Sequence, residues 1–257
     1  MIEAQEKLDD AQREGAVEKQ EEAIRELEQA KAELEEILRQ LREEEIARML
    51  AMLEARFRKM LAMQREVYEG TIRLDKVPKP QRSSNHTIEA SRQSGKEQQI
   101  VVEADKALLL LREDGTAVAF PEAVEQMRED MQQVVYRLAR AKVGQITQAI
   151  EEDIIAALEE MIEALKKAQE DLEQDNRPPP PNQPNRPQYP PLVDILAELK
   201  MIRALQMRIN TRTQRYSKLI EGEQAEQVEL IDALQRLAER EQRIHRVTRD
   251  LELGKNK

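Results

Sequence analysis

Apolar residues recur every three or four positions along most of this chain, over stretches much longer than an average helix. The clearest stretch alternates steps of three and four residues through Ile24, Leu27, Lys31, Leu34, Leu38 and Leu41. This spacing is typical of the apolar face along which the helices of a left-handed coiled coil meet. After a slip in phase at Glu43 to Glu45, the pattern resumes through Ile46, Leu50, Leu53, Phe57, Met60, Gln64 and Val67. Residues 1–70 are therefore predicted to form one long coiled-coil helix.

Between residues 71 and 96 the periodicity is lost and helix-breaking residues accumulate. Gly70 and Thr71 are expected to end the first helix, and Pro78, Pro80 and the pair Ser94-Gly95 follow. We interpret residues 71–96 as a flexible loop.

Residues 97–174 are predicted to hold a short helix and a long helix. Asp114-Gly115 ends the short helix, because glycine favours the left-handed backbone of a helix C-cap. The long helix begins at Pro121, which suits the first helical position. Gly144 lies inside it, where it marks either a bend or the close approach of another helix.

Residues 175–191 form a proline-rich linker. Eight of the fifteen residues from Arg177 to Pro191 are proline, a density that no helix or central strand tolerates. The segment predicts a semi-rigid polyproline spacer. One proline falls at every third residue, at Pro181, Pro184, Pro187 and Pro190, along one edge of a polyproline helix. A Pro-x-x-Pro reader domain could dock there, although a hinge is the simpler interpretation.

Residues 192–257 predict a last long helix that is interrupted near Gly222. Together these elements predict an all-α protein, an elongated bundle of long helices or an antiparallel coiled coil, with a flexible loop and a polyproline spacer. The pattern allows the helices to pair within one chain or between chains, so the oligomeric state stays open.

Composition supports thin layers of packing between helices. Aromatic residues are 2% of the chain, tryptophan is absent and charged residues are 36%. Such a chain lacks the large side chains of a thick globular core, but Leu, Ile, Met and Ala suffice between helices. The net charge of −10 disfavours a general nucleic-acid binder, because phosphate contacts need a basic surface.

Signals for a compartment are few. The acidic start has neither the basic region nor the apolar run of a signal peptide, and no segment has the length of a membrane span. The chain lacks cysteine, which excludes disulfides and thiolate chemistry. We expect a soluble chain, cytoplasmic by default, or in the cell envelope if it is a piece of a longer secreted protein.

Residues that could carry catalysis are sparse. His86 falls in the predicted loop and His245 in an arginine-rich helical turn, neither with the partners of a triad. The chain has no phosphate-binding glycine loop and no Glu-x-x-His motif of a di-metal bundle. The sequence predicts no catalytic, cofactor or metal site and no small-molecule substrate, so we do not expect an enzyme.

Basic residues suggest a docking face instead. Arg236, Arg240, Arg243 and Arg246 recur at steps of four, three and three, so they share one side of the last helix. The same holds for Arg208, Arg212 and Arg215. Such a face could bind an acidic partner, anionic lipid or nucleic acid. The simpler interpretation is that these arginines neutralise the acidic segment before Glu45.

Two passages are less generic than the rest: LLLLREDGTAVAFPEAVEQMREDM from Leu108 and PPLVDILAELKMIRALQMRINTRT from Pro190. With the proline-rich linker, they resemble a family of large coiled-coil proteins of planctomycete bacteria, over about Glu45 to Lys218. The resemblance implies an envelope-associated protein and part of a longer chain. It carries no activity and no functional residues over to this sequence, and the missing signal sequence departs from it.

The pattern favours a structural or interaction protein, a helical scaffold that binds a protein partner or another copy of itself through coiled-coil faces. One alternative is a peripheral membrane or envelope-associated protein that uses the arginine-rich C-terminal helix. Another is a coiled coil associated with nucleic acid, which the acidic charge disfavours.

Overall fold

The computed structural model describes residues 13–175, 190–218, 220 and 228–254. Within these ranges the chain is all-helical, with six α-helices, one short 3₁₀ helix and no strand, as the periodicity predicts. The chain divides into two compact units. The first comprises Met1–Ile46 with Pro179–Pro190, and the second comprises Ala47–Pro178 with Pro191–Lys257.

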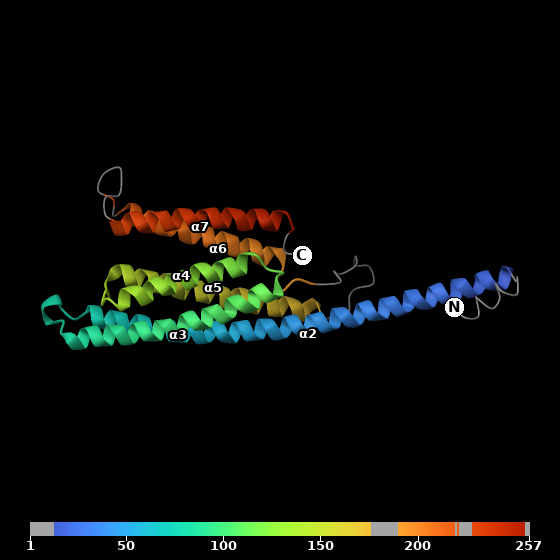
Figure 1. The fold of residues 1–257 in the computed structure, drawn as a ribbon, viewed down its shortest axis with the longest axis horizontal. Coiled ribbons are helices and arrows are strands. Elements are labelled where there is room, and N and C mark those ends of the chain that lie inside the picture. Colours follow the sequence, from blue (N-terminus) through green and yellow to red (C-terminus); the bar gives the residue numbers. More distant parts are fainter. Residues whose placement is uncertain (1–12, 176–189, 219, 221–227, 255–257) are drawn as a thin grey trace. The chain divides into compact units, whose positions relative to one another are not determined.

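Figure 1 labels the helices. They are α2 (Arg13–Asp75), the 3₁₀ helix η1 (Lys79–Gln81), α3 (Ser84–Asp114), α4 (Ala119–Leu138), α5 (Gln145–Asp175), α6 (Ile195–Ser217) and α7 (Val228–Glu252). Helix α2 is continuous through the slip in phase at Glu43 to Glu45.

The first unit contains the N-terminal part of α2. Ion pairs between neighbouring turns run along this part of the helix, such as Lys19 with Glu22 at 2.8 Å and Arg39 with Glu36 and Glu43, each at 2.6 Å. Pairs at this spacing each stabilise an exposed helix by a few tenths of a kcal/mol.

The second unit packs the remainder of α2 with α3, α4 and α5, each helix running opposite to the one before it (Figure 1). Helices α6 and α7 form a further antiparallel pair that packs against α4 and α5. The core of α2 to α5 is made of almost fully buried side chains: Leu50, Leu53, Phe57, Met60, Ile100, Leu111, Phe120, Met127, Met131, Leu138, Ile154, Leu158 and Leu165.

The prediction of a flexible loop over residues 71–96 is wrong for most of that range. Helix α2 continues through Gly70 and Thr71 to Asp75, and α3 begins at Ser84. The helix persists because polar and small residues occupy its buried face at steps of three and four. This buried face runs through His86, Ala90, Gln93, Glu97 and Ile100.

Gly70 makes room for the buried side chain of Gln93 of α3. A Cβ atom at Gly70 would lie 2.6 Å from Cδ of Gln93, whose side chain is buried. Gly70 therefore permits close packing of two helices instead of ending one.

The prediction of one long helix over residues 121–174 is also wrong. Helix α4 ends at Leu138, and α5 begins at Gln145 after a tight reversal. Ala141 adopts a left-handed backbone with φ of 52°, which is uncommon for a residue other than glycine. The Thr147 hydroxyl secures the turn, donating to the Lys142 carbonyl at 2.5 Å and accepting from Arg137 Nε at 2.9 Å. Gly144 marks this reversal and not a close approach, because no atom lies within 4 Å of a Cβ built there.

The proline-rich linker falls mostly outside the described residues, and so do Pro181, Pro184 and Pro187. Pro190 is described, and its carbonyl accepts a hydrogen bond of 3.3 Å from Arg42 Nε within the first unit. Gly222 also lies outside the described ranges, between the end of α6 and the start of α7. Among the helices that are described, none combines the length and the apolar character that crossing a bilayer requires.

Candidate functional site

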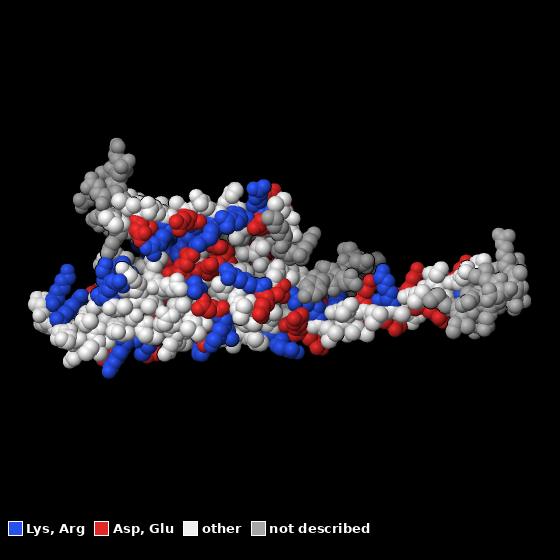
Figure 2. Space-filling view, in the orientation of Figure 1, with Lys and Arg blue, Asp and Glu red and all other residues white. Residues whose placement is uncertain are grey.

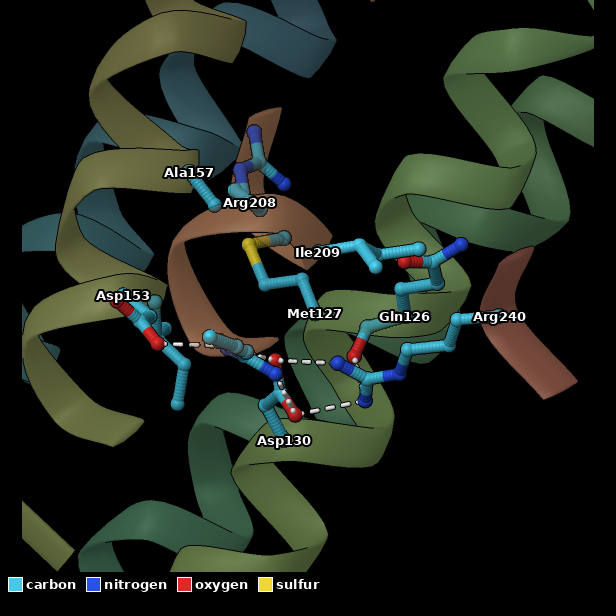
Figure 3. Close-up of a pocket in the computed structure, with 10 residues that line it drawn as sticks. Gln126, Met127, Asp130, Asp153, Ala157, Arg208, Ile209 and Arg240 are labelled. Atoms are coloured by element: carbon cyan, nitrogen blue, oxygen red, sulfur yellow. Dashed lines mark hydrogen bonds and ion pairs between the residues drawn. The ribbon is translucent and has the colours of Figure 1, made fainter. Parts of the chain in front are cut away.

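A cluster of buried charges connects four helices of the second unit. The carboxylate of Asp130 in α4 lies between the guanidinium groups of Arg212 in α6 and Arg240 in α7. Arg212 donates to Asp130 from Nη1 and Nη2 at 3.0 and 2.6 Å. Arg240 donates from Nη2 to Asp130 Oδ1 at 2.6 Å (Figure 3). All three side chains are buried, so the pairs are shielded from water.

Further acidic groups complete the cluster. Asp153 of α5 accepts from Arg212 Nε at 2.7 Å. Glu129 pairs with Arg240 at 3.2 Å and with Arg243 at 2.7 Å. Arg243 also lies 2.9 Å from Glu122. Figure 2 shows acidic and basic side chains interleaved where α7 faces α4.

Asp130 and Arg212 stay ionised. Burial by itself would raise the pKa of Asp130, but Arg212 and Arg240 outweigh it and hold the pKa well below its usual range. Burial would lower the pKa of Arg212, and the carboxylates of Asp130 and Asp153 raise it instead. A residue that stays charged at every ordinary pH is poorly suited to proton transfer.

The space beside the cluster is too small for a substrate. Its cavity measures about 10 Å³, the volume of roughly one water molecule. Met127, Ala157 and Ile209 enclose it from the other side (Figure 3). The cluster therefore holds α4, α5, α6 and α7 together, and its geometry supports a structural role.

Two other carboxyl groups are buried without a cationic partner. Gln64 Nε2 donates to Glu97 at 3.0 Å, and the Thr71 hydroxyl donates to Glu151 at 2.7 Å. One oxygen of each carboxyl group lacks a hydrogen-bond partner. Burial raises the pKa of Glu97 well above its usual value, with a contribution from Glu151. Burial also raises the pKa of Glu151 to about 7.

Glu151 can therefore gain or lose a proton near neutral pH. Across the residues with described positions, no group of three or more His, Asp or Glu side chains could hold a metal ion.

Glu198 of α6 binds the start of α4. Its Oε2 accepts hydrogen bonds from the backbone N–H groups of Val118 at 3.1 Å and Ala119 at 2.6 Å. The first N–H groups of a helix lack partners within the helix, so this carboxyl group satisfies two of them. Burial raises the pKa of Glu198, and the two backbone hydrogen bonds partly counteract the rise.

The first unit carries a feature of a different kind, an apolar stripe on α2 that lies open to solvent. We call it the exposed stripe; it comprises Val17, Ile24, Leu27, Leu34, Leu38 and Leu41, each between 47% and 61% exposed. We call Leu50, Leu53, Phe57, Met60, Gln64 and Val67 the buried seam; each is 0% exposed. The exposed stripe is the stronger candidate for a functional surface, because no described residue buries these apolar side chains.

The arginines of the predicted docking face do not form one free surface. Arg240 is buried, Arg243 is half-buried, and both pair with acids of α4. Arg236 is exposed and pairs with Asp232 of its own helix, and Arg246 is exposed. Arg240 and Arg243 are therefore neutralised within the second unit. Their acidic partners lie on α4, however, and not in the predicted segment before Glu45.

The two histidines are placed differently. His86 lies in α3, buried, with Nε2 3.1 Å from the Leu74 carbonyl, and not in a flexible loop. His245 is exposed on α7.

The buried acids were not anticipated as a site. Asp130 and Glu151 lie at the spacing of apolar core positions, since Asp130 falls between Met127 and Val134, and Glu151 falls between Thr147 and Ile154. An acid at such a position is the signal that sequence reasoning missed.

Comparisons with known proteins identify no relative: no family model, no curated protein and no solved structure matches the chain. The resemblance to planctomycete coiled-coil proteins therefore stays a prediction.

Proposed function

We propose that the protein is a helical interaction scaffold that binds a partner helix through a coiled-coil face on α2. The exposed stripe carries this proposal. Six large apolar side chains about half exposed along one helix face are costly to keep in water, roughly 25 cal/mol for each Å² of apolar surface. A partner that covers the face recovers that free energy.

The second unit supports the proposal because it is a packed helical body. Its helices are joined by a packed apolar core and by the ionic cluster around Asp130. The proposal includes the elongated coiled-coil assembly that the sequence predicts.

The alternative of a peripheral membrane protein depends on the arginines of the C-terminal helix being free to bind lipid. Arg240 and Arg243 are engaged by Asp130, Glu129 and Glu122, so two of the four arginines are not available to lipid phosphates.

The test uses the wild-type chain and two matched variants as baits that capture binding partners. The first carries Leu27→Lys and Leu34→Lys in the exposed stripe. The control carries Gln29→Lys and Gln40→Lys, which add the same charge at exposed positions on other faces of the helix. We expect wild type and control to retain the same bound protein, another copy included, and the stripe variant to lose it. Equal retention by all three would overturn the proposal.

A further inference from the structure

We infer that the exposed stripe pairs with the same segment of a second copy of this chain, as a parallel, in-register, two-stranded coiled coil. The inference rests on the proposed function and names its partner. It goes beyond that function because it specifies the stoichiometry, the direction and the alignment of the two helices.

The first argument is the choice of residues at the two core positions of the heptad, a and d. The steps of three and four place Val17, Ile24, Lys31 and Leu38 at a, and Gln20, Leu27, Leu34 and Leu41 at d. Branched Val and Ile at a with Leu at d favour two parallel strands over three or four.

The second argument is the charge beside the apolar core. The flanking e positions hold Glu21, Glu28 and Glu35, and the g positions hold Ala23, Ala30 and Ile37. In an antiparallel pair e faces e, so glutamate would face glutamate in every heptad of one side, which is unfavourable. In a parallel pair e faces g, so Glu28 faces Ala23 and Glu35 faces Ala30 of the second copy. The charge pattern therefore favours the parallel direction.

The third argument is Lys31, the charged residue among the core positions. Its side chain is exposed and its Nζ lies 3.7 Å from Glu35 of the same helix. A lysine at one a position weakens a coiled coil but sets its register and number of strands. In register, the two Lys31 side chains share one layer and can extend to water along their flexible stems. A shift by one heptad would place each lysine against Ile24 or Leu38 instead.

The fourth argument is symmetry. A pair related by a two-fold axis uses the same surface patch on both copies. The exposed stripe meets this requirement, because each layer of the parallel pair places a residue opposite itself: Leu27 on Leu27, Leu34 on Leu34 and Leu41 on Leu41. The segment from residue 17 to 41 is short for a coiled coil, so we expect an association that depends on concentration.

The first measurement is the mass of the full chain by sedimentation equilibrium across a range of concentrations. We expect wild type and the Gln29→Lys plus Gln40→Lys control to form dimers with the same dissociation constant. The Leu27→Lys plus Leu34→Lys variant should dissociate roughly a hundred-fold more readily, because two apolar layers are lost from the middle of the pair. Helix content by circular dichroism verifies that each variant is folded.

The second measurement determines direction. The chain has no cysteine, so Gln20→Cys introduces a unique thiol. In the parallel, in-register dimer the two Cys side chains share a layer, and a short bismaleimide joins them. In an antiparallel dimer aligned on Leu27 and Lys31, position 20 faces Leu38, so only a mixture of Gln20→Cys and Leu38→Cys chains is joined.

Each outcome decides the inference. Two results support it. The Leu27→Lys plus Leu34→Lys variant disrupts the dimer, and Gln20→Cys chains are cross-linked to each other. A monomer at every concentration, a dimer indifferent to the stripe, or cross-linking in the mixture alone overturns it. A monomeric chain that still retains a different protein through the stripe overturns this inference and leaves the proposed function intact.

Discussion

Helix α2 carries two apolar faces, of which one is exposed to solvent and the other is buried. The exposed stripe and the buried seam follow the same alternation of three and four residues, yet Leu34 is 61% exposed and Leu53 is 0% exposed. The pattern of apolar residues therefore specifies a helix and the face that must be covered. It does not specify whether the cover comes from the same chain.

The charged neighbours of the two faces differ as well. Beside the exposed stripe, ion pairs connect residues on adjacent turns, such as Lys31 with Glu35. In and beside the buried seam, polar groups reach other helices: Gln64 donates to Glu97 of α3, and Arg65 pairs with Glu159 of α5 at 2.6 Å. The seam thus has specific partners within the chain, which the stripe must find elsewhere.

The largest expected difference between the two faces is in the free energy of unfolding. Phe57→Ala should lower it by about 3–5 kcal/mol, because the side chain is fully buried and its removal leaves a cavity. Leu34→Ala should change the stability of the monomer by less than about 0.5 kcal/mol, because the side chain is already in water. Urea unfolding at concentrations that keep the chain monomeric measures both values. A large loss from Leu34→Ala in the monomer would mean that the stripe is covered by its own chain.

The second prediction contrasts ion pairs across helices with ion pairs along one helix. Asp130→Asn should destabilise the fold by about 3–5 kcal/mol, because it leaves the buried charges of Arg212 and Arg240 without their shared partner. Glu36→Gln, which removes an exposed pair with Arg39, should cost less than about 1 kcal/mol.

A triple replacement distinguishes loss of charge balance from loss of the carboxylate alone. Asp130→Leu combined with Arg212→Met and Arg240→Met removes the buried charges together and should recover much of the lost stability. If Asp130→Asn unfolds no more readily than Glu36→Gln, the cluster does not hold these helices together.

The all-α fold could be predicted from periodicity alone, because apolar spacing reports directly on helix geometry. The boundaries could not be predicted where tertiary contacts override local signals. Ser94 and Gly95 read as helix breakers, but Ser94 Oγ donates to the Val135 carbonyl of α4 at 2.9 Å, and Gly95 lies in open space. Packing of the surrounding turns compensates a cost of about 1 kcal/mol for glycine in a helix.

The reversal before α5 was predicted only as one of two interpretations of Gly144. Residues Ala139 to Val143 contain no proline or glycine, and the left-handed backbone of Ala141 lies next to Lys142, whose carbonyl accepts from Thr147. The arginines on one side of the last helix were recognised from their spacing. Their acidic partners were not, because pairing with Asp130 depends on which helices meet.

The third prediction concerns pH and the polar partners of the buried seam. Burial raises the pKa of Glu151 from its ordinary value of 4.5 to about 7, so between these values the folded chain holds more protons than the unfolded chain. Its contribution to stability is therefore complete below pH 4.5 and is lost as the pH rises through 7. Glu151→Gln should remove this loss and stabilise the fold at pH 8 by as much as roughly 3 kcal/mol, with little change near pH 4.

Urea unfolding from pH 4 to 8 measures that slope, and Glu36→Gln serves as a control that removes one exposed carboxylate. Equal slopes for wild type and Glu151→Gln would show that this carboxyl group titrates normally in the folded chain.

The smallest predicted effects compare two helix N-terminal caps: one is supplied by another helix, and one by the residue just before its own helix. Glu198 is buried and caps α4 from α6, whereas Asp194 caps α6 itself through a bond of 2.6 Å to the Ala197 N–H. Glu198→Ala should cost about 1–2 kcal/mol, because the N–H groups of Val118 and Ala119 lose a buried acceptor. Asp194→Ala should cost about 0.5–1 kcal/mol, because water can replace an exposed cap.

Hydrogen exchange locates each effect. Faster exchange of the backbone N–H is expected at Ala119 for Glu198→Ala and at Ala197 for Asp194→Ala. Glu198→Gln retains a carbonyl acceptor and should restore protection at Ala119. If Glu198→Ala leaves Ala119 protected, the contact between α6 and α4 does not depend on this carboxyl group, and the cross-helix ties of the second unit reduce to its apolar core and the Asp130 cluster.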